Sequence, residues 1–185
     1  LGYVLPLFSQ ITDKRDRVLI INPSPDIIEE LETMRPDGEN CYAVTDDTVA
    51  ALYRLQFPKS YFKTFEDVAF QNVDVALLLN RDRKILNNAR LLKALEGCVG
   101  QARVLALVPS SWFDSTDSSA YAELKRMGFT PKQMLIVDRT VTASSPRKKV
   151  FVLFERSEEA TFDLYMSSYD VKTREFSVID NSVQI

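Results

Sequence analysis

The chain has 185 residues, of which 45% are hydrophobic and 26% are charged, and its formal net charge is −3. These values are typical of an ordinary globular protein with one domain, and they argue against a globally cationic nucleic-acid-binding protein. Histidine is absent, which excludes triads built on a histidine base and metal sites ligated by histidine.

Short apolar runs alternate with helical patterns through the first two thirds of the chain. Continuous apolar runs are typical of strands buried on both faces of a parallel sheet. The predicted strands are 18–22, 41–44, 60–65, 73–79 and 104–108.

Helices are predicted between most of these strands. The first follows residue 22, with Asp26 as its cap, and ends near Gly38, because the segment 35–38 (RPDG) is a stop signal. Thr45 or Asp46 caps a second helix over 48–57. A third, over 84–96, carries an apolar stripe that includes Leu95 and faces the sheet.

The pattern changes after the fifth strand. A short helix over 119–127 precedes two apolar strands, 133–141 and 149–155, whose short connection predicts an antiparallel hairpin. Alternation over 162–179 predicts a second, partly exposed hairpin. The sequence thus predicts an N-terminal lead-in segment at 1–17, an α/β domain at 18–156 and a β-hairpin extension at 157–185.

Strand–helix units followed by a closing hairpin predict an α/β fold with a doubly wound, mostly parallel sheet and a closing antiparallel hairpin. In this order the chain resembles the Rossmann-like S-adenosylmethionine-dependent methyltransferases over 18–156. The segments 102–115 (ARVLALVPSSWFDS), 124–137 and 148–156 are similar to the adenine-amino DNA methyltransferases. The alternative for Pro109 and the two serines after it is a loop that ends a strand.

This resemblance implies a cofactor turn after the first strand, where the family has an acidic, glycine-rich loop. Here the turn reads Asn22-Pro23-Ser24-Pro25-Asp26. The prolines remove two backbone N–H donors, and only Asn22 tolerates a positive φ at low cost. We therefore expect S-adenosylmethionine to bind differently or, as we favour, not at all.

The resemblance implies further cofactor contacts after the second and third strands. Asp46 or Asp47 stands where the family holds the ribose, but a helix cap and a first-turn carboxylate explain both residues without any ligand. Phe65 and Glu66 stand where an aromatic ring and a carboxylate flank the adenine. The alternative there is a core phenylalanine beside a solvated turn.

The loop after the fourth strand contains candidate residues for catalysis and for nucleic-acid binding. In the family an Asn or Asp, two prolines and an aromatic residue hold the target base, and here only Asn80 matches. Arg81, Arg83 and Lys84 are cations at the carboxyl end of a central strand, where open α/β sheets bind ligands. They fit a phosphate backbone, and they equally fit an ordinary solvated loop.

Cys41 and Cys98 lie in apolar contexts without metal-ligand spacing, so we predict two buried thiols, no metal site and a reducing, cytoplasmic compartment. No apolar run is long enough to cross a bilayer. The chain begins with Leu1, from which we hypothesise that it is part of a longer parent chain, whose other domains are candidate partners.

Three hypotheses of function follow. The first is a catalytically degenerate methyltransferase-like domain that acts as a binding or structural module in a nucleic-acid-modifying system. The second is an active S-adenosylmethionine-dependent methyltransferase, with DNA adenine or another acceptor and an atypical cofactor pocket. The third, a response receiver, fits poorly because no acidic cluster follows the first strand and no lysine follows the fifth.

Overall fold

The structure is a computed structural model that describes residues 4–44, 46–64, 71–79, 94–109, 119–137, 149–156, 163–170, 173 and 175–184. The chain divides into two compact units, Leu1–Arg103 and Val104–Ile185. The boundary falls within one strand, β5 (Cys98–Pro109), so this strand contributes to both units.

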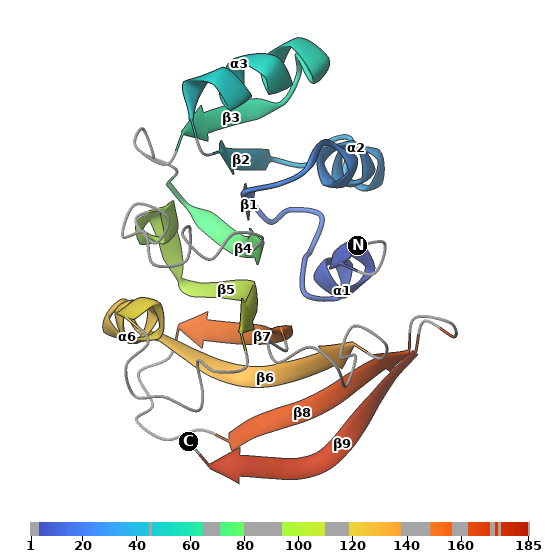
Figure 1. Ribbon diagram of the computed structural model, residues 1–185, viewed down its shortest axis with the longest axis vertical. Coiled ribbons are helices and arrows are strands. Elements are labelled where there is room, and N and C mark those ends of the chain that lie inside the picture. The colour runs from blue at the N-terminus through green and yellow to red at the C-terminus, as the bar shows by residue number, and fades with distance from the viewer. Residues whose placement is uncertain are drawn as a thin grey trace. The chain divides into compact units, whose positions relative to one another are not determined.

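Unit 1 is a sheet with helices on it (Figure 1). Its strand order is β3-β2-β1-β4-β5, and the pairs β1/β2, β1/β4 and β2/β3 are parallel. Its elements before β5 are α1 (Val4–Gln10), β1 (Val18–Ile21), α2 (Pro25–Met34), β2 (Asn40–Val44), α3 (Asp47–Gln56), β3 (Tyr61–Thr64), β4 (Val73–Leu79) and the 3-10 helix η1 (Ala94–Gly97).

The core of unit 1 lies along β1 and β4. All four side chains of β1 are fully buried, and so are nearly all of those of β4. The continuous apolar runs therefore form central strands covered on both faces, as the sequence predicted. Their burial is the dominant favourable term in the folding of this unit.

The start of α2 differs from the prediction. Ser24 occupies the N-cap position without a side-chain hydrogen bond, and Pro25 is the first helical residue, so Asp26 lies in the first turn rather than at the cap. Proline suits the first helical position because its fixed φ is helical and its missing N–H has no partner there anyway. The helix ends at Met34, next to the predicted stop signal.

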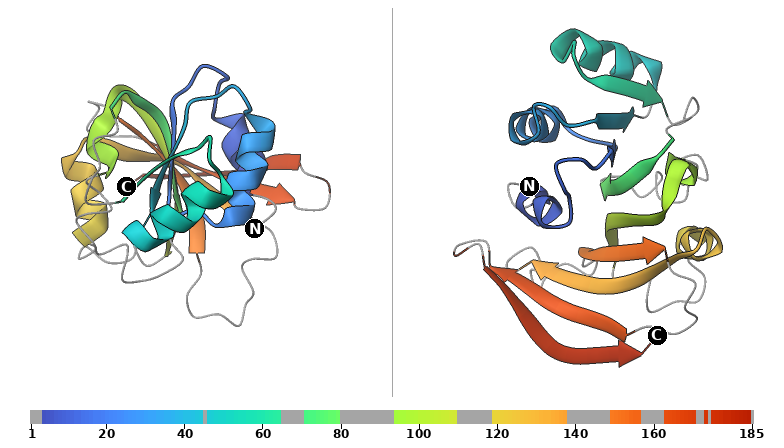
Figure 2. Two further views of the ribbon diagram at one scale, coloured as in Figure 1. Left: turned by 90° about the horizontal axis from the view of Figure 1, so that it is seen from above. Right: turned by 180° about the vertical axis from the view of Figure 1, so that it is seen from behind.

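The lead-in segment contains a helix that the sequence analysis did not predict. In α1 the side chains of Leu5, Leu7 and Phe8 are buried, and α1 contacts α2. The two helices lie on the same side of the strands of unit 1 (Figures 1 and 2). The apolar start of the chain is therefore part of the core of this unit.

Unit 2 is made mainly of strands, in the order β5-β7-β6-β8-β9. Its other elements are α6 (Ser119–Arg126), β6 (Phe129–Val137), β7 (Lys149–Arg156), β8 (Asp163–Asp170) and β9 (Glu175–Gln184). Figure 2 shows β6, β8 and β9 running side by side. The pairs β6/β7 and β8/β9 are antiparallel, so both predicted hairpins are confirmed.

Two features of unit 2 go beyond the sequence prediction. Strand β6 begins at Phe129, ahead of the predicted start at 133, and its pairing with β7 is irregular between Pro131 and Gln133. Strand β8 pairs with β6 in parallel, so the second hairpin extends the strand order instead of standing alone. Proline cannot donate to the ladder, which accounts for the irregularity at Pro131.

The predicted fold class is confirmed, because the strands form a mostly parallel α/β sheet with a closing antiparallel hairpin. The fifth strand is longer than predicted and begins at Cys98, soon after the end of the helix predicted over 84–96. Among the described residues, no helix is long and apolar enough to cross a membrane.

Candidate functional site

The first candidate site is the edge of unit 1 at which β1 and β2 end. The two strands are parallel neighbours with Ile21 opposite Ala43. The backbone N–H of Asn22 continues this ladder by donating to the carbonyl of Ala43 at 2.8 Å. The turn after β1 and the acidic residues after β2 therefore lie at the same edge, where open α/β sheets bind ligands.

The β1–α2 turn is built around one residue with left-handed backbone. Asn22 has φ 57°, which confirms the expectation that only this residue of the turn accepts a positive φ. Asparagine is among the few residues that adopt this conformation at low cost. The turn thus reaches α2 without a glycine.

The turn presents few backbone donors to a ligand. The N–H of Asn22 is bonded to Ala43, and Pro23 and Pro25 have no N–H. The carbonyl of Ser24 accepts from Ile27 and from the next residue at 3.1 Å each, inside the first turn of the helix. Anion binding at a helix start uses exposed N–H groups, and this turn has lost most of them.

A side chain from α3 contacts the same turn. The hydroxyl of Tyr53 donates to the carbonyl of Pro23 at 3.3 Å, and Pro23 is buried. At Pro23, the backbone that a glycine-rich turn would leave open to a cofactor is therefore covered by protein. On this observation the described part of the turn does not fit the methionine end of S-adenosylmethionine.

The acidic residues after β2 lie at the start of α3. Asp46 is the N-cap, and its Oδ1 accepts from the N–H of Val49 at 2.9 Å. Asp47 is exposed in the first turn. The cap alternative for Asp46 is thus confirmed, while a role of Asp46 or Asp47 toward ribose stays a prediction.

The remaining predicted site residues lie outside the described residues. They are Phe65, Glu66, Asn80, Arg81, Arg83 and Lys84. Their proposed roles toward adenine, the acceptor and nucleic acid therefore stay predictions from the sequence.

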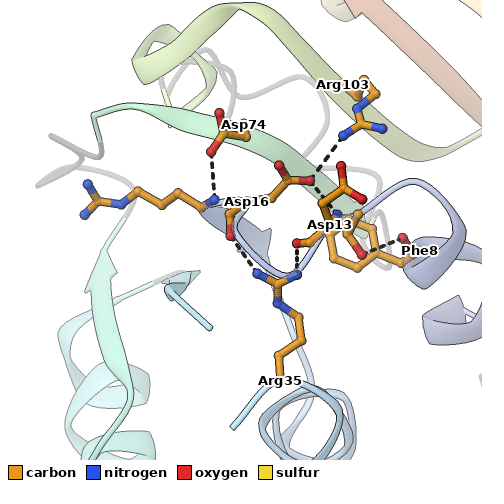
Figure 3. Close-up of polar contacts among 8 residues, drawn as sticks. Phe8, Asp13, Asp16, Arg35, Asp74 and Arg103 are labelled. Carbon is orange, nitrogen blue, oxygen red and sulfur yellow. Dashed lines mark hydrogen bonds and ion pairs between the residues drawn. The ribbon is translucent and has the colours of Figure 1, made fainter. Parts of the chain in front are cut away.

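A polar cluster at the amino ends of β1, β2 and β4 was not foreseen (Figure 3). Arg35, just after α2, donates to the carbonyls of Asp13 and Asp16 at 2.7 and 2.6 Å and to Asn40 Oδ1 at 3.2 Å. Asp16 also pairs with Arg103 at 3.1 Å. These bonds attach the segment before β1 to the sheet, which gives the cluster a structural role.

A second hydrogen-bonded group joins α2 to β2 and to the loop before β3. The carboxylate of Glu32 accepts from the hydroxyls of Tyr42 and Ser60. Burial, together with this carboxylate, raises the pKa of Tyr42 well above its ordinary value. The Tyr42 ring also stacks on Phe62, with centroids 5.0 Å apart, so this group is part of the core.

Both cysteines are free and buried, as predicted. Burial raises the pKa of the Cys41 thiol, although the nearby Arg17 acts in the opposite direction. A thiol of this kind is a poor nucleophile. Among the described residues, no group of His, Cys, Asp or Glu could hold a metal ion.

An open pocket of about 570 Å³ lies between α3 and β3. Its lining residues are Arg54, Pro58, Ser60, Tyr61, Phe62 and Lys63. The sequence analysis did not single out this site; the signal it passed over is a stretch from 48 to 64 that contains cations and aromatic rings but no acidic residue.

Comparisons with known proteins place the fold. No protein-family model matches the chain, and no curated protein matches it in sequence. Among solved structures, one similar protein is described as a class I S-adenosylmethionine-dependent methyltransferase from Listeria monocytogenes. It has a TM-score of 0.56 and 15% identity, over 88% of this chain and 63% of that protein. This chain therefore spans less than two thirds of that protein.

Two further structures are similar. A TehB-like S-adenosylmethionine-dependent methyltransferase from Corynebacterium glutamicum has a TM-score of 0.59 and 8% identity, over 84% of this chain and 88% of that one. A chain of a type I R-M system has a TM-score of 0.54 and 14% identity, over 92% of this chain and 44% of that one. At these identities the comparisons show the fold alone: the chain has the Rossmann-like methyltransferase fold.

Proposed function

We propose that this chain is a methyltransferase-like domain that has lost catalysis and acts as a binding or structural module in a nucleic-acid-modifying system. The observation that carries the proposal is the β1–α2 turn. Pro23 and Pro25 supply no N–H donor, the N–H of Asn22 bonds to Ala43, and the Tyr53 hydroxyl bonds to the carbonyl of Pro23. The missing prolines and aromatic residue after Asn80 support it from the sequence.

The link to nucleic acid rests on two lines of support. The sequence places Arg81, Arg83 and Lys84 after a central strand, and one of the similar structures belongs to a type I R-M system. Cations at such an edge would contact phosphates and confer a salt-dependent affinity.

The alternative is an active methyltransferase with an atypical pocket. The observation that favours it is the position of Asp47, an exposed carboxylate at the carboxyl end of β2. In this alternative Asp46 or Asp47 binds the ribose and Asn80 orients the acceptor. It requires the cofactor to reach the sheet edge without the usual backbone contacts.

Titration with S-adenosylmethionine and S-adenosylhomocysteine tests the proposal. We expect no saturable heat in calorimetry and no thermal shift. A ligand present at about a hundred times its Kd would stabilise the fold by roughly 2.7 kcal/mol, which such a measurement detects. Saturable binding would contradict the loss of cofactor binding and favour the alternative.

Matched variants would then identify the ribose ligand. Asp46→Asn keeps the helix cap and removes the charge, and Asp47→Ala removes the exposed carboxylate. Asp37→Ala is the control, because Asp37 is also exposed but follows α2, beyond its carboxyl-terminal end. Only the alternative predicts binding that Asp46→Asn or Asp47→Ala abolishes and Asp37→Ala leaves intact.

A further inference from the structure

We propose that the pocket between α3 and β3 binds a nucleotide, with its base on Tyr61 and its phosphate on Lys63 and Arg54. The pocket volume of about 570 Å³ lies within the usual range for small-ligand sites. The inference deepens the proposed binding role and rests on it. The pocket is separate from the edge at which β1 and β2 end, because it is lined by the end of α3, the following loop and β3.

The aromatic surface is supplied by Tyr61. Its side chain is 50% exposed, in contrast to the neighbouring Phe62, which is 3% exposed and packs into the core. Strand β3 stands at the end of the strand order, so its exposed ring is accessible from the edge of unit 1. Exposed rings of this kind stack on nucleic-acid bases without sequence preference.

The positive charge is supplied by two lining residues. The Lys63 Nζ lies over one face of the Tyr61 ring, 5.6 Å from its centroid. Arg54 donates from Nη2 to the carbonyl of Phe62 at 2.9 Å, which places its exposed guanidinium on the same strand. Cation and ring are therefore near enough for a single ligand to contact both.

The surrounding charge favours an anion. Two of the residues that line the pocket, Arg54 and Lys63, are cations, and no lining residue is acidic. The Glu32 carboxylate, which accepts from the Ser60 hydroxyl, does not line the pocket. A local positive potential on an acidic protein concentrates anions at this pocket.

A ring beside cations selects a ligand that combines an aromatic face with negative charge. An acidic peptide supplies charge alone, and inorganic phosphate supplies no stacking surface. A nucleotide supplies both the aromatic face and the negative charge, because one sugar carries its base and its phosphate. The ligand is either a free mononucleotide or one unit of a single strand.

The test is fluorescence or calorimetric titration of the full chain with AMP, inorganic phosphate and a short oligo-dT. We expect AMP or the oligonucleotide to bind and phosphate alone to bind much more weakly. Preference for AMP identifies a free nucleotide as the ligand, and preference for oligo-dT identifies a single strand. Failure of both nucleotide probes to bind at millimolar concentration overturns the proposal.

Substitutions in and beside the pocket test whether the nucleotide probes bind there. Tyr61→Ala is expected to weaken binding about tenfold, whereas Tyr61→Phe, which keeps the ring, retains it. Lys63→Gln is expected to weaken binding and, with oligo-dT, to lower the salt slope by roughly 0.7. Lys59→Gln is the matched control, because Lys59 is an exposed lysine in the loop before β3 that does not line the pocket.

Equal loss in Lys59→Gln and Lys63→Gln, or no loss in Tyr61→Ala, would overturn the assignment to this pocket. Circular dichroism of each variant verifies its fold, and the Lys63→Gln result stands if Tyr61→Ala does not fold. The outcome is separable from that of the proposed function, because none of these variants alters the turn or the aspartates tested with S-adenosylmethionine.

Discussion

At the scale of single residues, several charged side chains in the described part of unit 1 bond to backbone. Asp46 caps α3 through Val49, and Arg35 bonds to carbonyls in the segment before β1. Such bonds satisfy backbone groups that would otherwise lack partners. Asp46, which stands where the resemblance implies a ribose ligand, thus caps a helix. Its presence alone is therefore weak evidence for a cofactor.

The cap predicts a difference between two substitutions of Asp46. Asp46→Ala should lower the free energy of unfolding by about 1 kcal/mol, whereas Asp46→Asn should change it little, because asparagine caps a helix as well as aspartate does. Urea denaturation measures both values. Equal destabilisation by the two variants would mean that the charge, and not the cap, matters.

Arg35 predicts a larger effect. Arg35→Ala removes three side-chain hydrogen bonds and should cost about 2 kcal/mol. Arg35→Lys should restore little of this, because an ammonium group lacks the planar fork that reaches all three acceptors. Thermal denaturation compares the variants, and full rescue by lysine would contradict this account.

The buried hydroxyl of Tyr42 predicts a dependence on alkaline pH. Its pKa is raised in the folded state, so the unfolded state releases this proton first, near pH 10. Stability from this group is complete below that pH and falls as pH rises above it, by up to about 1.4 kcal/mol per pH unit. Tyr42→Phe should remove this part of the slope in denaturation curves measured from pH 8 to 11.

At the scale of elements, the contact between α3 and β3 is aromatic. Phe62 lies 5.0 Å from Tyr42, 5.7 Å from Tyr53 and 6.4 Å from Phe57, measured between ring centroids. One strand residue thus joins β2, α3 and the residue that ends α3. The same contact positions Tyr53 near the β1–α2 turn and Arg54 at the pocket between α3 and β3.

This contact predicts that Phe62→Ala is severely destabilising. Loss of a buried phenylalanine costs about 3 to 5 kcal/mol, and three ring contacts would be lost with it. Phe62→Leu should be milder because it refills part of the volume. Urea denaturation distinguishes the two, and similar small costs would show that the site collapses around the missing ring.

At the scale of the whole molecule, stability is expected to be uneven within unit 1. Strand β1 is paired on both sides and fully buried, whereas β3 pairs with β2 and stands at the end of the strand order. Local opening requires less free energy where fewer contacts are broken. Ligand sites on such edges tolerate movement better than sites on central strands.

Hydrogen exchange tests this gradient. We expect the amides of Val18–Ile21 to be the slowest to exchange and those of Tyr61–Thr64 to exchange markedly faster. Addition of AMP should slow exchange in β3 if the nucleotide pocket is correct. Equal protection of β1 and β3 without ligand would contradict the gradient.

The sequence by itself determined the order of the described strands, the left-handed Asn22 and, with Thr45 as the alternative, the cap formed by Asp46, because apolar runs, prolines and caps act over a few neighbouring residues. Only the tertiary structure decided which distant groups meet. It brought Tyr53 onto Pro23, Arg35 onto Asp13, β8 beside β6, and Arg54 beside the edge of β3. Such contacts depend on how elements pack after they form, and packing brings together residues whose separation along the chain leaves no local pattern to read.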